Sequence, residues 1–153
     1  MKQHVIATCM TVIVGVSICG CSSVGAGGGG SAASLFDKFG GSQNVTSMAN
    51  DLVHKTISDP RLAGLTGGRN IDPVASSGQV SNQLCSMLGG GCKAPLSESQ
   101  VASAASKVSP AQSQAISENF QSTLSRYASN SKVRDSVTKA VGNKMPGVLG
   151  GLL

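Results

Sequence analysis

Aromatic side chains are scarce in this chain of 153 residues, which has three Phe, one Tyr and no Trp. Proteins that hold single-stranded nucleic acid commonly stack bases on aromatic side chains. The scarcity therefore argues against a nucleic-acid partner, although the chain carries 12 Lys and Arg against 7 Asp and Glu.

Patterns that mark common catalytic sites are also missing. After residue 21 the only His is His54, and no Cys–His pairing, G-x-S-x-G motif or pair of carboxylates on one helix face is found. A single His is too few for an ordinary metal site. Residues 25–30 formally match G-x-G-x-x-G, but no strand precedes them and no acidic partner follows in a βαβ frame. We therefore expect neither an enzyme nor a bound metal.

The apolar run near the start of the chain is too short to span a bilayer comfortably. It covers Val5 to Ile18, whereas a transmembrane helix needs about 20 apolar residues. Lys2 precedes it with a positive charge. This pattern is typical of a secretory signal peptide, which we predict over residues 1–20 and exclude from the fold.

The predicted signal peptide ends in Ile18-Cys19-Gly20-Cys21, which resembles a bacterial lipobox. The resemblance implies that Cys21 is lipidated and anchors the chain to a membrane. Cys19 fits the motif less well, because the bulky Ile18 would precede it, and an ordinary signal peptide with incidental cysteines is the alternative. Ser22, rather than Asp, follows Cys21, which by resemblance implies an outer-membrane lipoprotein of the cell envelope, facing the periplasm.

Two further segments complete the chain. Residues 21–33 begin with the lipidated Cys and continue as an uncharged Gly/Ser/Ala-rich linker, which predicts a flexible tether reaching about 20 Å on average. Residues 34–153 are long enough for one domain with its own core.

Apolar residues from Leu35 onward recur at helical spacing, and no run alternates as a strand would, so we predict an all-α fold. The clearest helix ends at Asp59-Pro60, because the residue before proline avoids helical angles. Its apolar stripe consists of Val45, Met48, Ala49, Leu52, Val53 and Ile57.

Two later helices have marked starts. Ser97 with Gln100, and Ser109 with Gln112, match the capping-box pattern, and Pro110 stands at the first helical position, where proline is favoured. The second of these helices is long and presents Ala115, Ile116, Phe120, Leu124 and Tyr127 on one face.

The remaining segments are less regular. Residues 66–78 are rich in Gly, Asn and Ser and contain Pro73, which predicts a loop with at most a turn of helix. A short helix should come next, with Val80, Leu84 and Met87 or Leu88 inward. A last helix is expected over 132–141, broken by Met145-Pro146-Gly147, after which the apolar tail 148–153 either docks back or frays.

Cys85 and Cys92 are the two cysteines left after the predicted lipidation site. An even pair in an exported protein favours a disulfide, and Leu88-Gly-Gly-Gly91 between them can turn the chain back. The alternative is two buried thiols.

The excess of positive charge gathers late in the chain. A solvated helix face is the favoured interpretation, and contact with anionic lipid is the alternative. The residues concerned are Arg126, Lys132, Arg134, Lys139 and Lys144, with only Asp135 opposing them.

Several segments together resemble the group 1 truncated haemoglobins. Ser34-Leu-Phe-Asp-Lys-Phe-Gly-Gly41 and the corner Ser58-Asp-Pro-Arg-Leu-Ala-Gly64 look like the opening of that family. The segment 84–92, Val108-Ser109, and Val137–Gly142 with Pro146 then come in the family's order, so the resemblance covers about residues 34–149. It implies a truncated globin-like helical sandwich, whereas periodicity alone also allows a generic helical bundle.

The resemblance implies haem as cofactor, but the positions that would hold it lack the required chemistry. By the resemblance, Ser103 stands where the family has its proximal His, and Val53 stands where it has its distal Tyr. The aromatic residue with which the family clamps the haem would fall near Leu65 and Thr66. Other possible iron ligands are His54 and Lys107, although a rim or exposed position is the plainer interpretation of His54.

Two functions remain. The first is an anchored envelope lipoprotein whose globin-like domain has lost haem ligation and acts as a binding or structural module, with an envelope protein as possible partner. The second is a haem protein for O₂ or NO binding or transport that uses a non-standard iron ligand.

Overall fold

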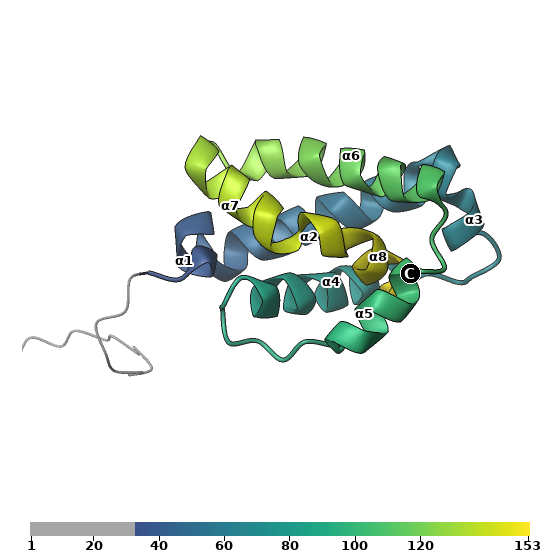
Figure 1. Cartoon of the computed structure of the whole chain (residues 1–153), viewed down its shortest axis with the longest axis horizontal. Coiled ribbons are helices and arrows are strands. Elements are labelled where there is room, and N and C mark those ends of the chain that lie inside the picture. Colours follow the sequence, from purple (N-terminus) through teal and green to yellow (C-terminus); the bar gives the residue numbers. More distant parts are fainter. Residues whose placement is uncertain (1–32) are drawn as a thin grey trace, which may run out of the picture. The chain divides into compact units, whose positions relative to one another are not determined.

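A computed structural model describes residues 33–153 of the chain (Figure 1). The predicted signal peptide (1–20), Cys21 and the predicted tether up to residue 32 lie outside the described residues. Residues 33–153 form helices and turns without a β-strand, which confirms the all-α prediction. None of the helices in this part is long and apolar enough to cross a membrane.

The short helix closed by Gly-Gly is present. Helix α1 (Leu35–Phe39) starts with a capping box between Ser34 and Asp37. Gly40 then adopts a φ of 108°, a left-handed conformation that glycine reaches without steric cost. The chain turns there into α2 (Gly41–Ser58), whose predicted apolar stripe is buried except for the half-buried Ile57.

The Asp-Pro-Arg-Leu corner ties the end of α2 to a distant helix. The 3-10 helix η1 (Pro60–Leu62) leads into α3 (Ala63–Thr66). The guanidinium of Arg61 donates to Asp59 at 2.9 Å and to Glu118 of α6 at 2.6 Å, and the amide of Asn119 donates to Asp59 at 2.9 Å. These bonds hold the pKa of Asp59 well below its usual value, chiefly because Arg61 donates to the carboxylate.

The loop prediction for residues 66–78 was wrong in its second half. Helix α4 spans Pro73–Met87 and is therefore not short. Asp72 caps it by accepting from the backbone N–H groups of Val74 and Ala75. Pro73 occupies the first turn, where its missing N–H costs nothing, so it begins the helix rather than interrupting a loop. Val80, Leu84 and Leu88 point inward as predicted.

Both predicted capping boxes are present. Ser97 with Gln100 opens α5 (Glu98–Ala105), and Ser109 with Gln112 opens α6 (Pro110–Tyr127). In each box the serine hydroxyl accepts from the third backbone N–H of the helix, and the glutamine side chain accepts from the serine N–H. The inward row of α6 is buried as predicted, with Tyr127 at its partly buried end.

The end of the chain is more ordered than the sequence suggested. Helix α7 (Ser131–Val141) passes through the 3-10 helix η2 (Gly142–Lys144) into α8 (Met145–Leu152). Pro146 lies in the first turn of α8, so the predicted break is the start of another helix. The tail docks, because Met145 to Leu149 are all buried, and the fraying alternative was wrong.

The helices form a core in which α2 and α8 are the central members. Helix α2 packs against α4 and α6, while α8 packs against α5, α6 and α4 (Figure 1). Aliphatic and Met side chains supply most of the filling, each contributing about 1.5–3 kcal/mol when fully buried. Those with almost no exposed surface include Met48, Leu52, Val53, Leu62, Val80, Leu84, Ile116, Phe120, Leu124, Met145 and Leu149.

Glycines let α8 approach α5 closely. A Cβ added at Gly147 would meet the carbonyl oxygen of Val101, a backbone atom that cannot swing away. A Cβ at Gly151 would lie 2.8 Å from Leu96 Cδ1 and 3.3 Å from Ala104 Cβ. The two helices therefore pack nearly backbone to backbone.

We predict that Gly147→Ala lowers the free energy of unfolding by about 1–3 kcal/mol, because the new methyl group forces α8 away from α5. Gly78→Ala is the matched control, since Gly78 also lies inside a helix and nothing lies within 4 Å of its would-be Cβ. That control should stabilise the protein by about 0.5–1 kcal/mol. Urea unfolding followed by circular dichroism measures both. Equal effects of the two substitutions would show that α5 and α8 are not in tight contact.

Candidate functional site

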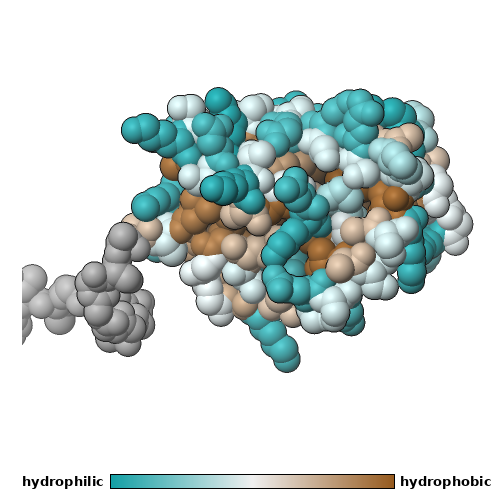
Figure 2. Space-filling view, viewed as in Figure 1, coloured by the Kyte–Doolittle hydropathy of each residue, from teal (hydrophilic) through white to brown (hydrophobic). Residues whose placement is uncertain are grey.

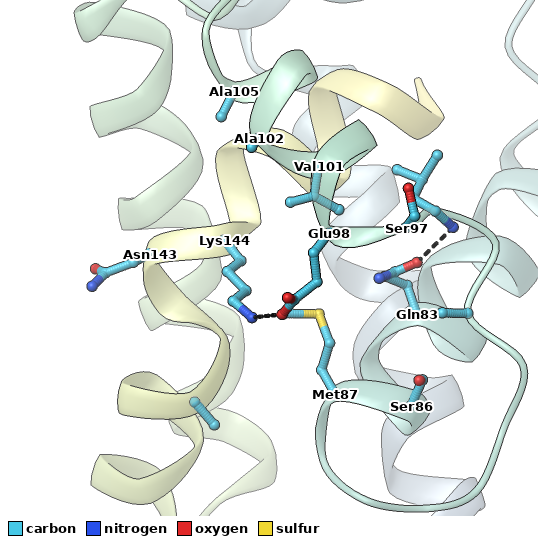
Figure 3. Close-up of a pocket in the computed structure, with 13 residues that line it drawn as sticks. Gln83, Ser86, Met87, Ser97, Glu98, Val101, Ala102, Ala105, Asn143 and Lys144 are labelled. Carbon is cyan, nitrogen blue, oxygen red and sulfur yellow. Dashed lines mark hydrogen bonds and ion pairs between the residues drawn. The ribbon is translucent and has the colours of Figure 1, made fainter.

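A groove of about 670 Å³ opens at the surface between α4, α5 and the junction of α7 with η2 (Figure 3). The connection from α4 to α5 forms part of its wall. This volume lies within the range of about 300–1,000 Å³ that is usual for small-molecule sites. On the face seen in Figure 2, hydrophobic side chains reach the surface between hydrophilic ones.

The floor of the groove is apolar. Met87 comes from α4, Leu96 from the connection, Val101 and Ala105 from α5, and Ala140 from α7. Val101 and Ala105 are four residues apart and so share a face of α5. Helical periodicity sets which side chains each helix turns to the groove, and the packing of the helices brings these distant residues together.

An ion pair spans the mouth of the groove. The ammonium of Lys144 lies 2.7 Å from a carboxylate oxygen of Glu98, so η2 and the start of α5 are joined across the opening (Figure 3). Lys144 donates to Glu98 and thereby lowers the pKa of that carboxylate. The side chains are 47% and 89% exposed, and pairs this exposed contribute little to stability.

Gln83 supports the groove from below. It is 4% exposed, and its side-chain oxygen accepts from the backbone N–H of Leu96 at 2.9 Å. This bond attaches the connection between α4 and α5 to the body of α4. Gln83 was not among the residues predicted from the sequence, although its position between the inward residues Val80 and Leu84 was a usable signal.

Cys85 and Cys92 form a disulfide, as predicted, with their Cα atoms 5.6 Å apart. Cys85 is buried at the end of α4, and Cys92 lies in the connection that walls the groove. Gly90 packs against this bond, since a Cβ there would lie 2.6 Å from Cys85 Sγ and 2.7 Å from the ring of Phe36. The disulfide and Gln83 therefore hold the same wall at two points.

The positions implied by the haem resemblance do not meet in this groove. Val53 is fully buried in α2, and Leu65 and Thr66 are half-buried in α3. Ser103 lies on α5 but is exposed and does not line the groove.

The two alternative iron ligands also face solvent. His54 on α2 and Lys107 after α5 are both exposed, and neither lines the groove. Within residues 33–153, no group of three or more His, Cys, Asp and Glu side chains is placed to hold a metal ion.

The late basic residues do not form one uniform face. Lys132 and Lys139 are exposed on α7, whereas Lys144 is paired over the groove. Arg126 lies 3.9 Å from Asp51 of α2. A smaller cavity of about 350 Å³ between α1 and α7 is lined in part by Lys38 and Lys132.

We predict that reducing the Cys85–Cys92 disulfide lowers the free energy of unfolding by about 2–3 kcal/mol, because the closed loop is short. Urea unfolding with and without reductant measures the change. The double variant Cys85→Ala/Cys92→Ala should have the same free energy of unfolding as the reduced protein, and reductant should not change it. If reductant leaves the free energy of unfolding of the parent protein unchanged as well, the two thiols are not paired in solution.

Comparison with models of known protein families finds no match to this chain, and comparison with curated proteins finds none either.

Proposed function

We propose that this chain is a lipid-anchored protein of the bacterial envelope whose domain has a truncated globin-like fold without haem ligation. The domain works as a binding module, and the groove between α4, α5 and α7 is its binding site. It is not an enzyme.

The order of the helices supports the globin-like part of the proposal. A short helix and a long one lead into the Asp-Pro-Arg-Leu corner, and α4 to α8 then come in the order that the resemblance implies. Crossed helices around a pocket are the packing expected of globins.

The face that α5 turns to the groove carries the proposal that haem ligation is lost. That face consists of Glu98, Val101, Ala102 and Ala105, none of which supplies an imidazole, thiolate, thioether or phenolate to iron. Ser103, at the position of the family's proximal His, is exposed. Val53, at the distal position, has no polar group and is fully buried.

The anchoring part of the proposal depends on the lipobox resemblance at Cys21. The uncharged Gly/Ser/Ala-rich composition of residues 21–33 supports a tether after the anchor, with a reach of about 20 Å on average. An exported domain would meet oxidising conditions, which fit the Cys85–Cys92 disulfide. Another envelope protein is then a possible partner, and nucleic acid is not.

Hemin titration tests the loss of haem ligation. All the buried hydrophobic residues of the described core lie from Phe39 to Leu153, so a chain that begins at Ser22 keeps that core. We predict that this chain shows no Soret band of a ligated haem, either as purified or after incubation with hemin. Absorption spectra over the Soret and visible bands, which respond to the axial ligands of the haem iron, provide the measurement.

A strong Soret band would contradict this prediction, and two variants would then identify the ligand. Loss of the band in His54→Ala would assign the iron to His54. Loss of the band in Lys107→Ala would assign it to Lys107. Either result would favour the alternative function, a haem protein for O₂ or NO, over that of a binding module.

Metabolic labelling with a tagged fatty acid tests the anchor. We predict that Cys21→Ser abolishes incorporation of the label and releases the protein from the membrane fraction. Cys19→Ser is the matched control, because this cysteine lies two residues away and should leave labelling intact. Absence of label in the parent protein would favour an ordinary signal peptide, and loss of label only in Cys19→Ser would move the lipid to Cys19.

A further inference from the structure

We propose that the groove between α4, α5 and α7 binds the carboxylate of a straight alkyl chain, such as a fatty acid, with Lys144 as the group that recognises the carboxylate. This inference rests on the proposed function, because it names the class of ligand for the same groove.

The size and lining of the groove suit an alkyl chain. In a cavity of about 670 Å³, the side chains of Met87, Leu96, Val101 and Ala105 can cover an alkyl chain and remove its apolar surface from water. Polar side chains, among them Ser86, Ser97 and Asn143, complete the lining. The Met side chain is flexible and adapts to the shape of an apolar ligand. Small residues on α5 and α7 leave room above the floor.

Lys144 gives the groove its selectivity for an anion. Its ammonium stands at the mouth beside the apolar floor, and its only hydrogen-bond partner in the described part of the chain is Glu98. The two side chains differ in exposure, because Glu98 is 89% exposed and Lys144 is 47% exposed.

This difference decides which charge remains at the groove when the pair opens. The Glu98 carboxylate can turn fully into water at little cost, whereas the partly buried stem of Lys144 keeps its ammonium over the opening. An incoming carboxylate whose chain already lies on the apolar floor then replaces Glu98 as the partner of Lys144. Figure 3 shows Lys144 and Glu98 reaching toward each other from η2 and from the start of α5.

The wall opposite α7 is already in place before a ligand arrives. Gln83 holds the backbone at Leu96, and the disulfide holds Cys92 to the end of α4. A site whose wall is held in this way loses less conformational entropy on binding than one that must order a loop.

Calorimetry and NMR with decanoate test the proposal on the chain that begins at Ser22. We expect one decanoate to bind per chain, with chemical-shift changes at Met87, Leu96, Val101 and Lys144. Decanol and decylamine have the same alkyl chain without the negative charge, and each should bind at least tenfold more weakly.

Three variants separate recognition of the charge from filling of the groove. Lys144→Gln should weaken decanoate binding about tenfold and abolish the preference over decanol. Glu98→Gln removes the competing carboxylate and should strengthen decanoate binding severalfold. Ala105→Leu reduces the space over the floor and should weaken both ligands, with its helical circular dichroism and melting temperature checked against the parent.

Lys139→Gln is the matched control, because Lys139 is an exposed lysine on α7 that does not line the groove. It should leave decanoate binding unchanged. An equal loss in Lys139→Gln and Lys144→Gln would overturn the proposal, since it would reveal a general effect of positive charge.

Other results would also overturn it. The first is that decanoate does not bind the folded protein, and the second is that the chemical-shift changes lie away from the groove. The third is that decanol or decylamine binds as tightly as decanoate. The fourth is that a concentration-dependent dimer covers Val101. Failure with decanoate while hemin still gives no Soret band would overturn only this inference. A ligated Soret band would overturn the proposed function itself.

Discussion

The close approach of α8 to α5 holds the end of the chain in the domain and places one side of the groove. A chain with only four aromatic side chains has few large groups with which to fill space between helices. Glycines on α8 instead let the helices approach closely. Gly147 lies against the backbone of Val101, and Gly151 lies against Leu96 and Ala104. Dispersion contacts at such short range recover part of the stabilisation that large side chains would supply.

This contact also shapes the groove. Because α8 is drawn against α5, the preceding η2 lies beside the start of α5, and Lys144 comes within 2.7 Å of Glu98. The other wall is held by the Cys85–Cys92 disulfide and by the bond from Leu96 to Gln83. The groove is therefore a consequence of how the helices are packed and joined, and no single motif encodes it.

The sequence predicted well those helix features that depend on residues near each other in the chain. Both capping boxes and the apolar stripe of α2 depend on residues within a few positions of each other, so they are visible without tertiary structure. The two wrong expectations, a loop over residues 66–78 and a break at Met145-Pro146-Gly147, both concern a proline. Each proline lies in the first turn of a helix, where proline is tolerated, and only the burial of the residues after it shows that a helix continues.

Residue identity and neighbours along the chain were enough to predict the helical class and the helix caps. They also favoured a Cys85–Cys92 disulfide over two buried thiols. The groove and the Lys144–Glu98 ion pair at its mouth depend on the tertiary structure instead. Lys144 and Glu98 are 46 positions apart, and Gln83 and Leu96 are 13 apart. Side chains at such separations meet only after the helices have packed, and the packing depends on the summed fit of many apolar surfaces.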